Sequence, residues 1–296
     1  MEPPVGTAQD RIAASRRQPG RRQPGQRRTG RGWRLGGHGR RQRAGLITAA
    51  VVLAAAATVV AVRLLSAGGA ACQLSLVPAY FAPASGWDQA VSSARPPAVM
   101  ILDISGSGAG DAPEPGFQAA VSRARAAGVT VLGYIGTSYG RQRVAAVQAD
   151  VRDYRSWYGV TDVFLDQAAS GAAGLGYYQN LAGYLHRVNP GAKIWLNPGV
   201  YPDKRYMSFA SVIMVYEGSY ENYRNIRVPA WAGQYPASRF AHTIYATPAS
   251  QLTAALTLSR SRHAGYVYIT DGSGSNPYGA LPAYWAAEDA ALSARC

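Results

Sequence analysis

The stretch that decides the fold reads VTDVFLDQAASG and runs from Val160 to Gly171. The segment Val163–Leu165 is apolar on both faces, which is typical of a parallel strand covered on both sides. It ends abruptly in two polar side chains, Asp166 and Gln167. Because α/β folds place their chemistry at the carboxyl ends of such strands, the stretch predicts a buried strand with a functional edge.

The same unit recurs along the C-terminal three quarters of the chain. Strands are predicted at Leu74–Phe81, Ala98–Ser105, Thr130–Gly136, Thr161–Gln167, Ala192–Gly199, Val212–Ser219, Phe240–Thr247 and Gly265–Asp271. Helical spacing is clear at Phe117–Ala127, Arg141–Tyr158, Gly176–Val188, Ser250–His263 and Tyr278–Ala291, and weaker at Trp87–Arg95, Asp203–Phe209 and Tyr220–Arg224. Eight alternations predict an α/β fold, a (β/α)8 TIM-type barrel. The alternative, a doubly wound open sheet, lacks a G-x-G-x-x-G phosphate turn.

The positive charge of the chain is concentrated at its N-terminus. The net charge is +14, and residues 1–43 hold twelve arginines against Glu2 and Asp10, whereas residues 64–296 are nearly neutral. Because this tail is rich in Arg, Gln, Gly and Pro and lacks apolar periodicity, we expect it to be disordered. Binding of the tail to anionic lipid is conceivable, and we expect no specific nucleic-acid partner.

Residues 44–65 are predicted to form a transmembrane helix or signal anchor. The run Ala44–Val62 has 19 residues without a charge, which nearly covers the ~30 Å hydrocarbon core. The flanking arginines place the tail in the cytoplasm and the C-terminal domain outside a single-pass cell-membrane protein. Cleavage near residue 71, giving a secreted protein, is the alternative. A short linker, 66–73, leads to the domain 74–296.

Two cysteines, Cys72 and Cys296, bracket the exported part of the chain. In an oxidising compartment this placement predicts a disulfide that ties the ends of the domain together, and two free thiols are the alternative. The four histidines show no metal-ligand spacing, so we expect neither a metal nor a cofactor.

The barrel prediction gathers polar residues at the carboxyl ends of the strands. These residues are Tyr80, Asp103, Tyr134, Asp166, Asn197, Glu217, Tyr245 and Asp271. Asp166 and Glu217 each end an apolar run, so we expect half-buried carboxyl groups aimed at a common rim. Acids on predicted helices, such as Glu288, are expected on solvated surface.

Six segments carry a resemblance to a known family. In chain order they are VPAYFAP, VMILDISG, VLGYIGTSYG, VFLDQ, IWLNPG and VIMVYEGSY. Together they resemble the spherulin-4-like family, also called spherulation-specific family 4. That family is similar to polysaccharide-degrading glycoside hydrolases with a (β/α)8 barrel, including enzymes that cleave galactosamine or N-acetylgalactosamine polymers. The resemblance implies a polysaccharide substrate, and we expect a monomer.

The resemblance also implies a catalytic pair, Asp166 and Glu217. The family has an Asp-Glu pair at the end of strand four and a further Glu at the end of strand six, and here Gln167 stands in the second position of the pair. An amide does not titrate near neutral pH, although it can hydrogen-bond a sugar hydroxyl. Either the remaining pair suffices for hydrolysis, or the chain is a catalytically inactive carbohydrate-binding or cell-envelope protein.

Roles follow from the neighbours of each residue. Tyr216 and Tyr220 give Glu217 an aromatic setting that would raise its pKa and suit it as general acid, with Asp166 as the ionised partner. Because neighbours on a regular strand point to opposite faces, we do not expect Asp166 and Gln167 to share the barrel mouth. The expected substrate-binding residues are Gln167, Asp103, Tyr80, Tyr134, Asn197, Tyr216, Tyr268 and Asp271, the tyrosines by stacking on sugar rings. Retaining and inverting mechanisms both stay open.

Overall fold

A computed structural model of the protein describes residues 72–293. Eight parallel strands form a closed barrel in which each strand pairs with the next and β8 pairs with β1. The strands are β1 Leu74–Ala79, β2 Val99–Leu102, β3 Thr130–Gly136, β4 Asp162–Asp166, β5 Ile194–Leu196, β6 Val212–Ser219, β7 Phe240–Tyr245 and β8 Tyr266–Ile269. Every strand lies within its predicted range, and the (β/α)8 prediction is confirmed.

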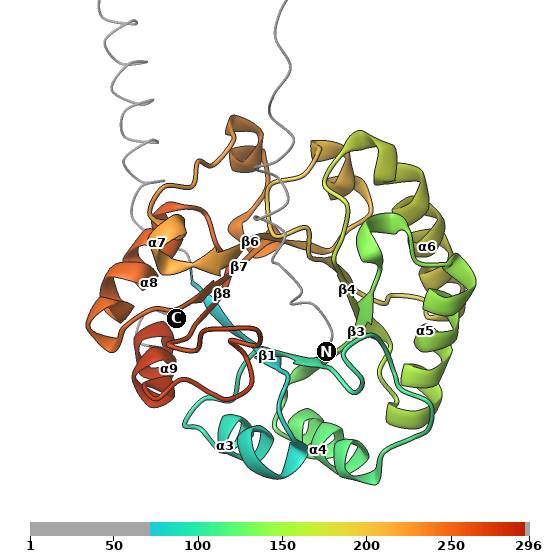
Figure 1. Cartoon of the computed structure of the whole chain (residues 1–296), viewed down its shortest axis with the longest axis horizontal. Helices are drawn as coiled ribbons and strands as arrows, with labels where there is room; N and C mark the ends of the chain where they lie inside the picture. The colour runs from blue at the N-terminus through green and yellow to red at the C-terminus, as the bar shows by residue number, and fades with distance from the viewer. Residues whose placement is uncertain (1–71, 294–296) are drawn as a thin grey trace, which may run out of the picture. The chain divides into compact units, whose positions relative to one another are not determined.

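Helices surround the ring of strands (Figure 1). The longer ones are α4 Pro115–Ala126, α5 Val144–Tyr158, α6 Leu175–Val188, α8 Leu252–Ser261 and α9 Trp285–Ser293. The weaker predicted links contain the short helices α3 Asp88–Val91 and α7 Tyr220–Tyr223 and, between β5 and β6, the 3-10 turn Lys204–Ser208. α5 ends where Gly159 adopts a left-handed conformation, φ 65°, which costs glycine little.

Alternate residues along each strand separate an inner core from an outer one. In β4, Phe164 belongs to the cluster inside the barrel, whereas Val163 and Leu165 belong to the cluster packed against the helices. Asp166 continues the inward set because strand side chains alternate. The barrel therefore turns the last residue of β4 toward its own mouth.

One irregularity in β6 decides which side chain reaches the same mouth. The register of β6 with β7 shifts between Met214 and Tyr216. Met214 lies in the inner core, whereas Tyr216 lies in an outer cluster with Tyr223. A β-bulge changes the face on which the following residues lie. Tyr216 is thereby turned outward, and Glu217 is turned inward.

A close approach of helix and sheet occurs at Gly133 of β3. A Cβ atom at this position would lie 2.7 Å from the ring of Tyr154 on α5. The Tyr154 hydroxyl reaches two strands, with distances of 2.8 Å to the carbonyl oxygen of Tyr134 and 3.2 Å to that of Leu102. The missing side chain at Gly133 therefore lets α5 fasten β2 and β3 from outside.

Glu288 on α9 corrects an expectation. We expected this acid on solvated surface, but it is 0% exposed. Its Oε1 accepts a hydrogen bond from the backbone N–H of Ile269, at 2.9 Å, and burial raises its pKa well above the ordinary value. Glu288 is therefore buried in a position where it accepts a hydrogen bond from the last backbone N–H of β8.

Several predictions concern parts outside the described residues. The tail 1–43 and the segment 44–65 lie there, as does Cys296, so the disulfide between Cys72 and Cys296 stays a prediction. Within residues 72–293 no cysteine is a free thiol. None of the helices described is long and apolar enough to cross a membrane.

Candidate active site

A cavity of about 320 Å³ opens at the carboxyl ends of the strands, and we call it the rim pocket. Seven of the eight polar residues predicted at the strand ends line it: Tyr80, Asp103, Tyr134, Asp166, Asn197, Glu217 and Tyr245. They come from β1 through β7 or from the residues that directly follow these strands. The parallel barrel thus collects in one place side chains that are far apart in the sequence.

Asn197 joins the two candidate catalytic carboxyl groups. Its Nδ2 donates to Asp166 Oδ1 at 2.6 Å and to Glu217 Oε2 at 2.5 Å. Because both hydrogen bonds start from one nitrogen, the distance between Asp166 Oδ1 and Glu217 Oε2 cannot exceed the sum of the two bond lengths, about 5.1 Å. The Asn197 oxygen accepts from the Gly199 N–H at 3.0 Å, which sets the orientation of the amide.

Asp166 is surrounded by donors. Its Oδ2 accepts from the Tyr134 hydroxyl at 2.8 Å and its Oδ1 accepts from Asn197. Burial raises the pKa of Asp166, while these bonds and the backbone N–H of Gln167 lower it. Because hydrogen bonds to a carboxylate favour its charged form, Asp166 is the better placed of the two acids to carry the charge.

Glu217, in contrast to Asp166, lies in surroundings that favour its protonated form. Burial and the nearby charge of Asp166 raise its pKa to about 7. Burial also raises the pKa of Asp103, which lines the same pocket. Asp166 and Glu217 lie too close for both to ionise easily, so the pair loses its protons in two steps, and Glu217, with a pKa raised to about 7, is the acid that keeps its proton to the higher pH.

Gln167 lines the rim pocket together with Asp166. The strand alternation predicted that the two would not share the mouth, and this expectation is wrong. Gln167 has φ 48°, a left-handed conformation that breaks the alternation directly after β4. Its carbonyl oxygen accepts from the Tyr139 N–H at 2.7 Å and from Thr137 Oγ1 at 2.9 Å, and these bonds hold the unusual backbone in place.

Three predicted binding residues do not reach the rim pocket. Tyr216 is 2% exposed, and its hydroxyl donates to the carbonyl oxygen of Ser219. Tyr268 is 0% exposed and packs against Trp285 of α9. Asp271 is exposed but lies outside the pocket lining. Buried rings in the helix layer cannot stack on a sugar, so these two tyrosines belong to the core.

Tyr139, which the sequence also offered as a residue for stacking on sugar rings, lines the pocket from the turn after β3. The segment Gly274–Tyr278 was missed, and it comes from the connection between β8 and α9. Its letters GSNP mark a loop, whereas Tyr278 was predicted to begin a helix that in the structure begins at Trp285. No strand or helix periodicity reports where such a loop folds, and only the three-dimensional structure places it over the barrel mouth.

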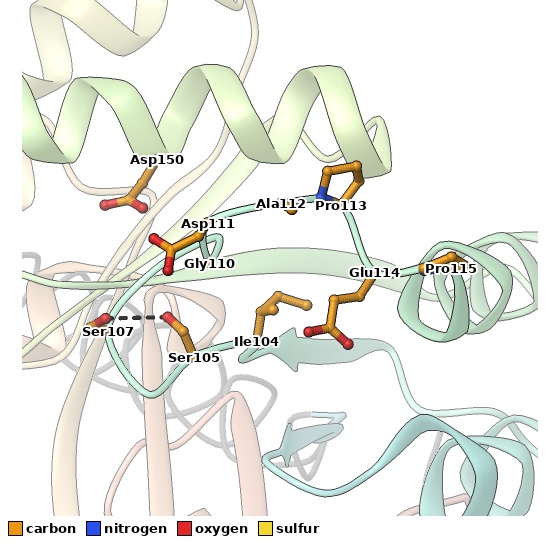
Figure 2. A pocket seen from close by; sticks show the side chains of 10 residues that line it. All are labelled: Ile104, Ser105, Ser107, Gly110, Asp111, Ala112, Pro113, Glu114, Pro115 and Asp150. Carbon is orange, nitrogen blue, oxygen red and sulfur yellow. Dashed lines mark hydrogen bonds between the residues drawn. The ribbon is translucent and has the colours of Figure 1, made fainter.

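A second hollow, of about 640 Å³, lies beside the loop between β2 and α4 (Figure 2). The segment Gly110–Pro115 and Asp150 of α5 contribute to its lining. It contains none of the predicted site residues, so the rim pocket is the candidate active site. Among the described residues no three His, Cys, Asp or Glu side chains cluster as metal ligands do.

A parallel barrel with two carboxyl groups at the carboxyl ends of its strands is an arrangement that many glycoside hydrolases use. The model of the spherulation-specific family 4 matches residues 75–292, and the chain belongs to this family. Spherulin-4 of Physarum polycephalum is 28% identical over 232 residues, which cover 74% of this chain and 70% of that protein. The family resemblance seen in the sequence is thereby confirmed.

Solved structures share the fold. Aspergillus clavatus Sph3 in complex with GalNAc has a TM-score of 0.64 and 21% identity, covering 75% of this chain and 97% of that chain. A GH18 chitinase from Pseudoalteromonas aurantia has a TM-score of 0.50 and 12% identity, covering 76% of this chain and 100% of that chain. These likenesses show that the fold of this chain is shared with both solved structures.

Proposed function

We propose that this chain is a glycoside hydrolase that cleaves an amino-sugar polysaccharide of the galactosamine or N-acetylgalactosamine type. The observation that carries the proposal is the pair Asp166 and Glu217, held by one Asn197 amide and unequal in protonation. Glycosidases need one protonated and one ionised carboxyl group on opposite sides of the bond they cleave.

The geometry suits a two-step displacement. Glu217 gives its proton to the leaving oxygen as the glycosidic C–O bond breaks, and Asp166 forms an ester bond with the anomeric carbon. Glu217, now ionised, removes a proton from water, and the resulting hydroxide replaces Asp166 on that carbon. Asn197 stays bonded to both carboxyl groups and keeps their spacing constant.

Two further observations support a sugar substrate. Tyrosines line the rim pocket at positions 80, 134, 139, 245 and 278, and aromatic rings offer both a stacking face and a polar hydroxyl. A structure with the same fold was solved with GalNAc bound. The proposed place of action, the outer cell surface, rests on the apolar segment 44–65 of the sequence alone.

The test is release of reducing ends from galactosamine and N-acetylgalactosamine polymers. Asp166→Asn and Glu217→Gln should each lower kcat at least about 1,000-fold, because Asp166→Asn removes the nucleophile and Glu217→Gln removes the proton donor. Glu221→Gln makes the same chemical change on the exposed surface of α7, four residues from Glu217, and should keep full activity. If the unmodified protein and the three variants were equally active, Asp166 and Glu217 would not be the catalytic pair.

Gln167 favours a second candidate, a carbohydrate-binding protein without turnover. Its amide occupies the pocket beside Asp166, where the family pattern has a carboxyl group. Gln167→Glu separates the candidates: a severalfold rise in kcat is expected if position 167 takes part in the chemistry, and an unchanged rate excludes that role. Polymer binding without turnover, unaffected by Asp166→Asn, would favour the binding protein.

A further inference from the structure

Tyr278 lies in the loop between β8 and α9, outside every strand and helix. It lines the rim pocket, yet it is only 4% exposed. Its ring meets the ring of Tyr80 edge-on, with 5.7 Å between the centroids. Its backbone N–H donates to Asn276 Oδ1 at 3.0 Å. The side chain is therefore a fixed part of the pocket wall.

The Tyr278 hydroxyl lies between two partners of different chemistry. It donates to Thr243 Oγ1 at 3.2 Å. Thr243 pairs with Glu217 across β6 and β7, and both Tyr278 and Glu217 line the rim pocket, so the hydroxyl lies beside the Glu217 carboxyl group and, as a donor, lowers the pKa of Glu217. Thr243 is 0% exposed, and its own hydroxyl contacts the Met214 sulfur at 3.4 Å. Because a phenol has a single proton, Tyr278 can donate fully to only one of the two oxygens at a time.

We propose that Tyr278 is a positioning residue for Glu217, whose hydroxyl donates to Glu217 when that carboxyl group is ionised and to Thr243 when it is protonated. The catalytic role of Tyr278 rests on the proposed function, whereas the exchange of its hydrogen bond between Glu217 and Thr243 does not. A carboxylate accepts a stronger, charge-assisted bond than a neutral hydroxyl does. The hydroxyl therefore follows the charge on Glu217 by rotation, with no net transfer of a proton.

Several ionisable groups face Glu217 from the surrounding elements. They are Tyr80 after β1, Asp103 after β2, Tyr134 on β3, Asp166 on β4, Tyr245 on β7 and Tyr278 itself. Asp166 acts by its charge and raises the pKa of Glu217, whereas Asn197 and Tyr278 donate hydrogen bonds that lower it. Burial raises the pKa of Tyr278 well above its ordinary value, so the phenol keeps its proton throughout.

The experiment follows the Glu217 carboxyl group directly, without substrate. The full chain is labelled with 13C at the glutamate carboxyl carbons and titrated by NMR, and Glu217→Gln assigns the signal. In Tyr278→Phe the midpoint should rise by about 0.5–1 pH unit, because the ionised form loses a donor. In Thr243→Val the midpoint should fall, because Tyr278 loses its competing acceptor. Tyr284→Phe removes a buried hydroxyl that donates to the carbonyl oxygen of Thr247 at 2.9 Å, and it should leave the midpoint unchanged.

An unmoved midpoint in folded Tyr278→Phe would overturn the proposal. If that variant does not fold, Thr243→Val decides alone, and an unchanged or raised midpoint would reject the exchange. If the protein cleaves the polymer, the alkaline limb of the pH profile of kcat/KM should shift in each variant by as much as the midpoint of the Glu217 titration. An alkaline limb that does not shift would also contradict the role of Tyr278. A shifted midpoint in a protein without turnover would reject the proposed hydrolysis and leave the role of Tyr278 intact.

Discussion

At the scale of single residues, two identical functional groups that share the amide of Asn197 have different surroundings. Asp166 receives the Tyr134 hydroxyl in addition to the amide, whereas Glu217 lies under the influence of the Asp166 charge. Burial alone would raise the pKa of both carboxyl groups. The difference between them comes from the number of donors that each one meets.

Glu217 should limit both activity and stability as the pH rises. Activity should decline above about pH 7, where the acid loses its proton. The folded state binds this proton more tightly than the unfolded state, whose carboxyl titrates near 4.5, so the stabilisation present below pH 4.5 is lost as the pH rises toward 7. Glu217→Gln should therefore be more stable than the natural protein at pH 8 by about 1–2 kcal/mol.

Urea unfolding at pH 4 and pH 8 checks this expectation. The gain should shrink at the lower pH, because a protonated carboxyl group and an amide are similar in size and charge. Glu221→Gln, on the exposed surface, should show no such dependence. A gain of the same size at both pH values would point to packing rather than to the proton.

At the scale of elements, β3 and α5 together hold Asp166, the proposed nucleophile. Tyr134 on β3 donates to Asp166, and the main-chain carbonyl of the same residue accepts from Tyr154 on α5. The turn after β3 adds Thr137, whose N–H and Oγ1 both donate to the Asp166 carbonyl oxygen. The position of the Asp166 side chain therefore depends on a helix that never enters the pocket.

Gly133→Ala should loosen this arrangement. The added methyl group meets the Tyr154 ring at 2.7 Å, so the ring and α5 must move outward. Overpacking of this kind should destabilise the protein by about 1–3 kcal/mol in urea unfolding. We also expect kcat to fall several-fold, because Tyr134 shifts with the strand. Gly233→Ala, where the added Cβ atom would meet nothing within 4 Å and φ is not left-handed, is the control and should leave stability and kcat nearly unchanged.

At the scale of the whole molecule, the architecture was largely predictable. Runs such as Val163–Leu165 are apolar on both faces only when helices cover the sheet, and eight such runs leave few alternatives to a barrel. Asp166 and Asn197 could be placed at the mouth because parallel strands end on one side. Composition and periodicity thus predict which residues lie together at the carboxyl ends of the strands.

The remaining parts of the site depend on single backbone angles and on loop paths. Tyr216 and Glu217 exchange faces at an irregularity that no residue type marks, and Gln167 enters the pocket through one left-handed φ. Tyr278 reaches the pocket from the loop before α9, although the helical spacing predicted that a helix begins at this residue. These features arise from long-range packing, which local propensity does not encode.

The closed barrel also predicts the stereochemical outcome. It sets β4, β5 and β6 side by side, so that Asn197, directly after the middle strand, holds one carboxyl oxygen of Asp166 and one of Glu217 no more than about 5.1 Å apart. This upper limit favours the roughly 5 Å separation of retaining glycosidases over the wider gap of inverting ones. Proton NMR of the first product released should show the anomeric configuration of the substrate, and an inverted anomer would contradict the assigned nucleophile.

The irregularity in β6 also affects how relatives of this chain should be aligned. Val215 is the extra residue, because Met214 and Tyr216 pair with Ala241 and His242, which are successive residues of β7. A relative that lacks one residue here would form a regular strand with the same pairing, and its acid would still face the barrel mouth. A relative of equal length with a regular sixth strand would instead turn the tyrosine inward. A one-residue gap at this position is therefore compatible with an intact acid, whereas an ungapped match is not sufficient evidence for one.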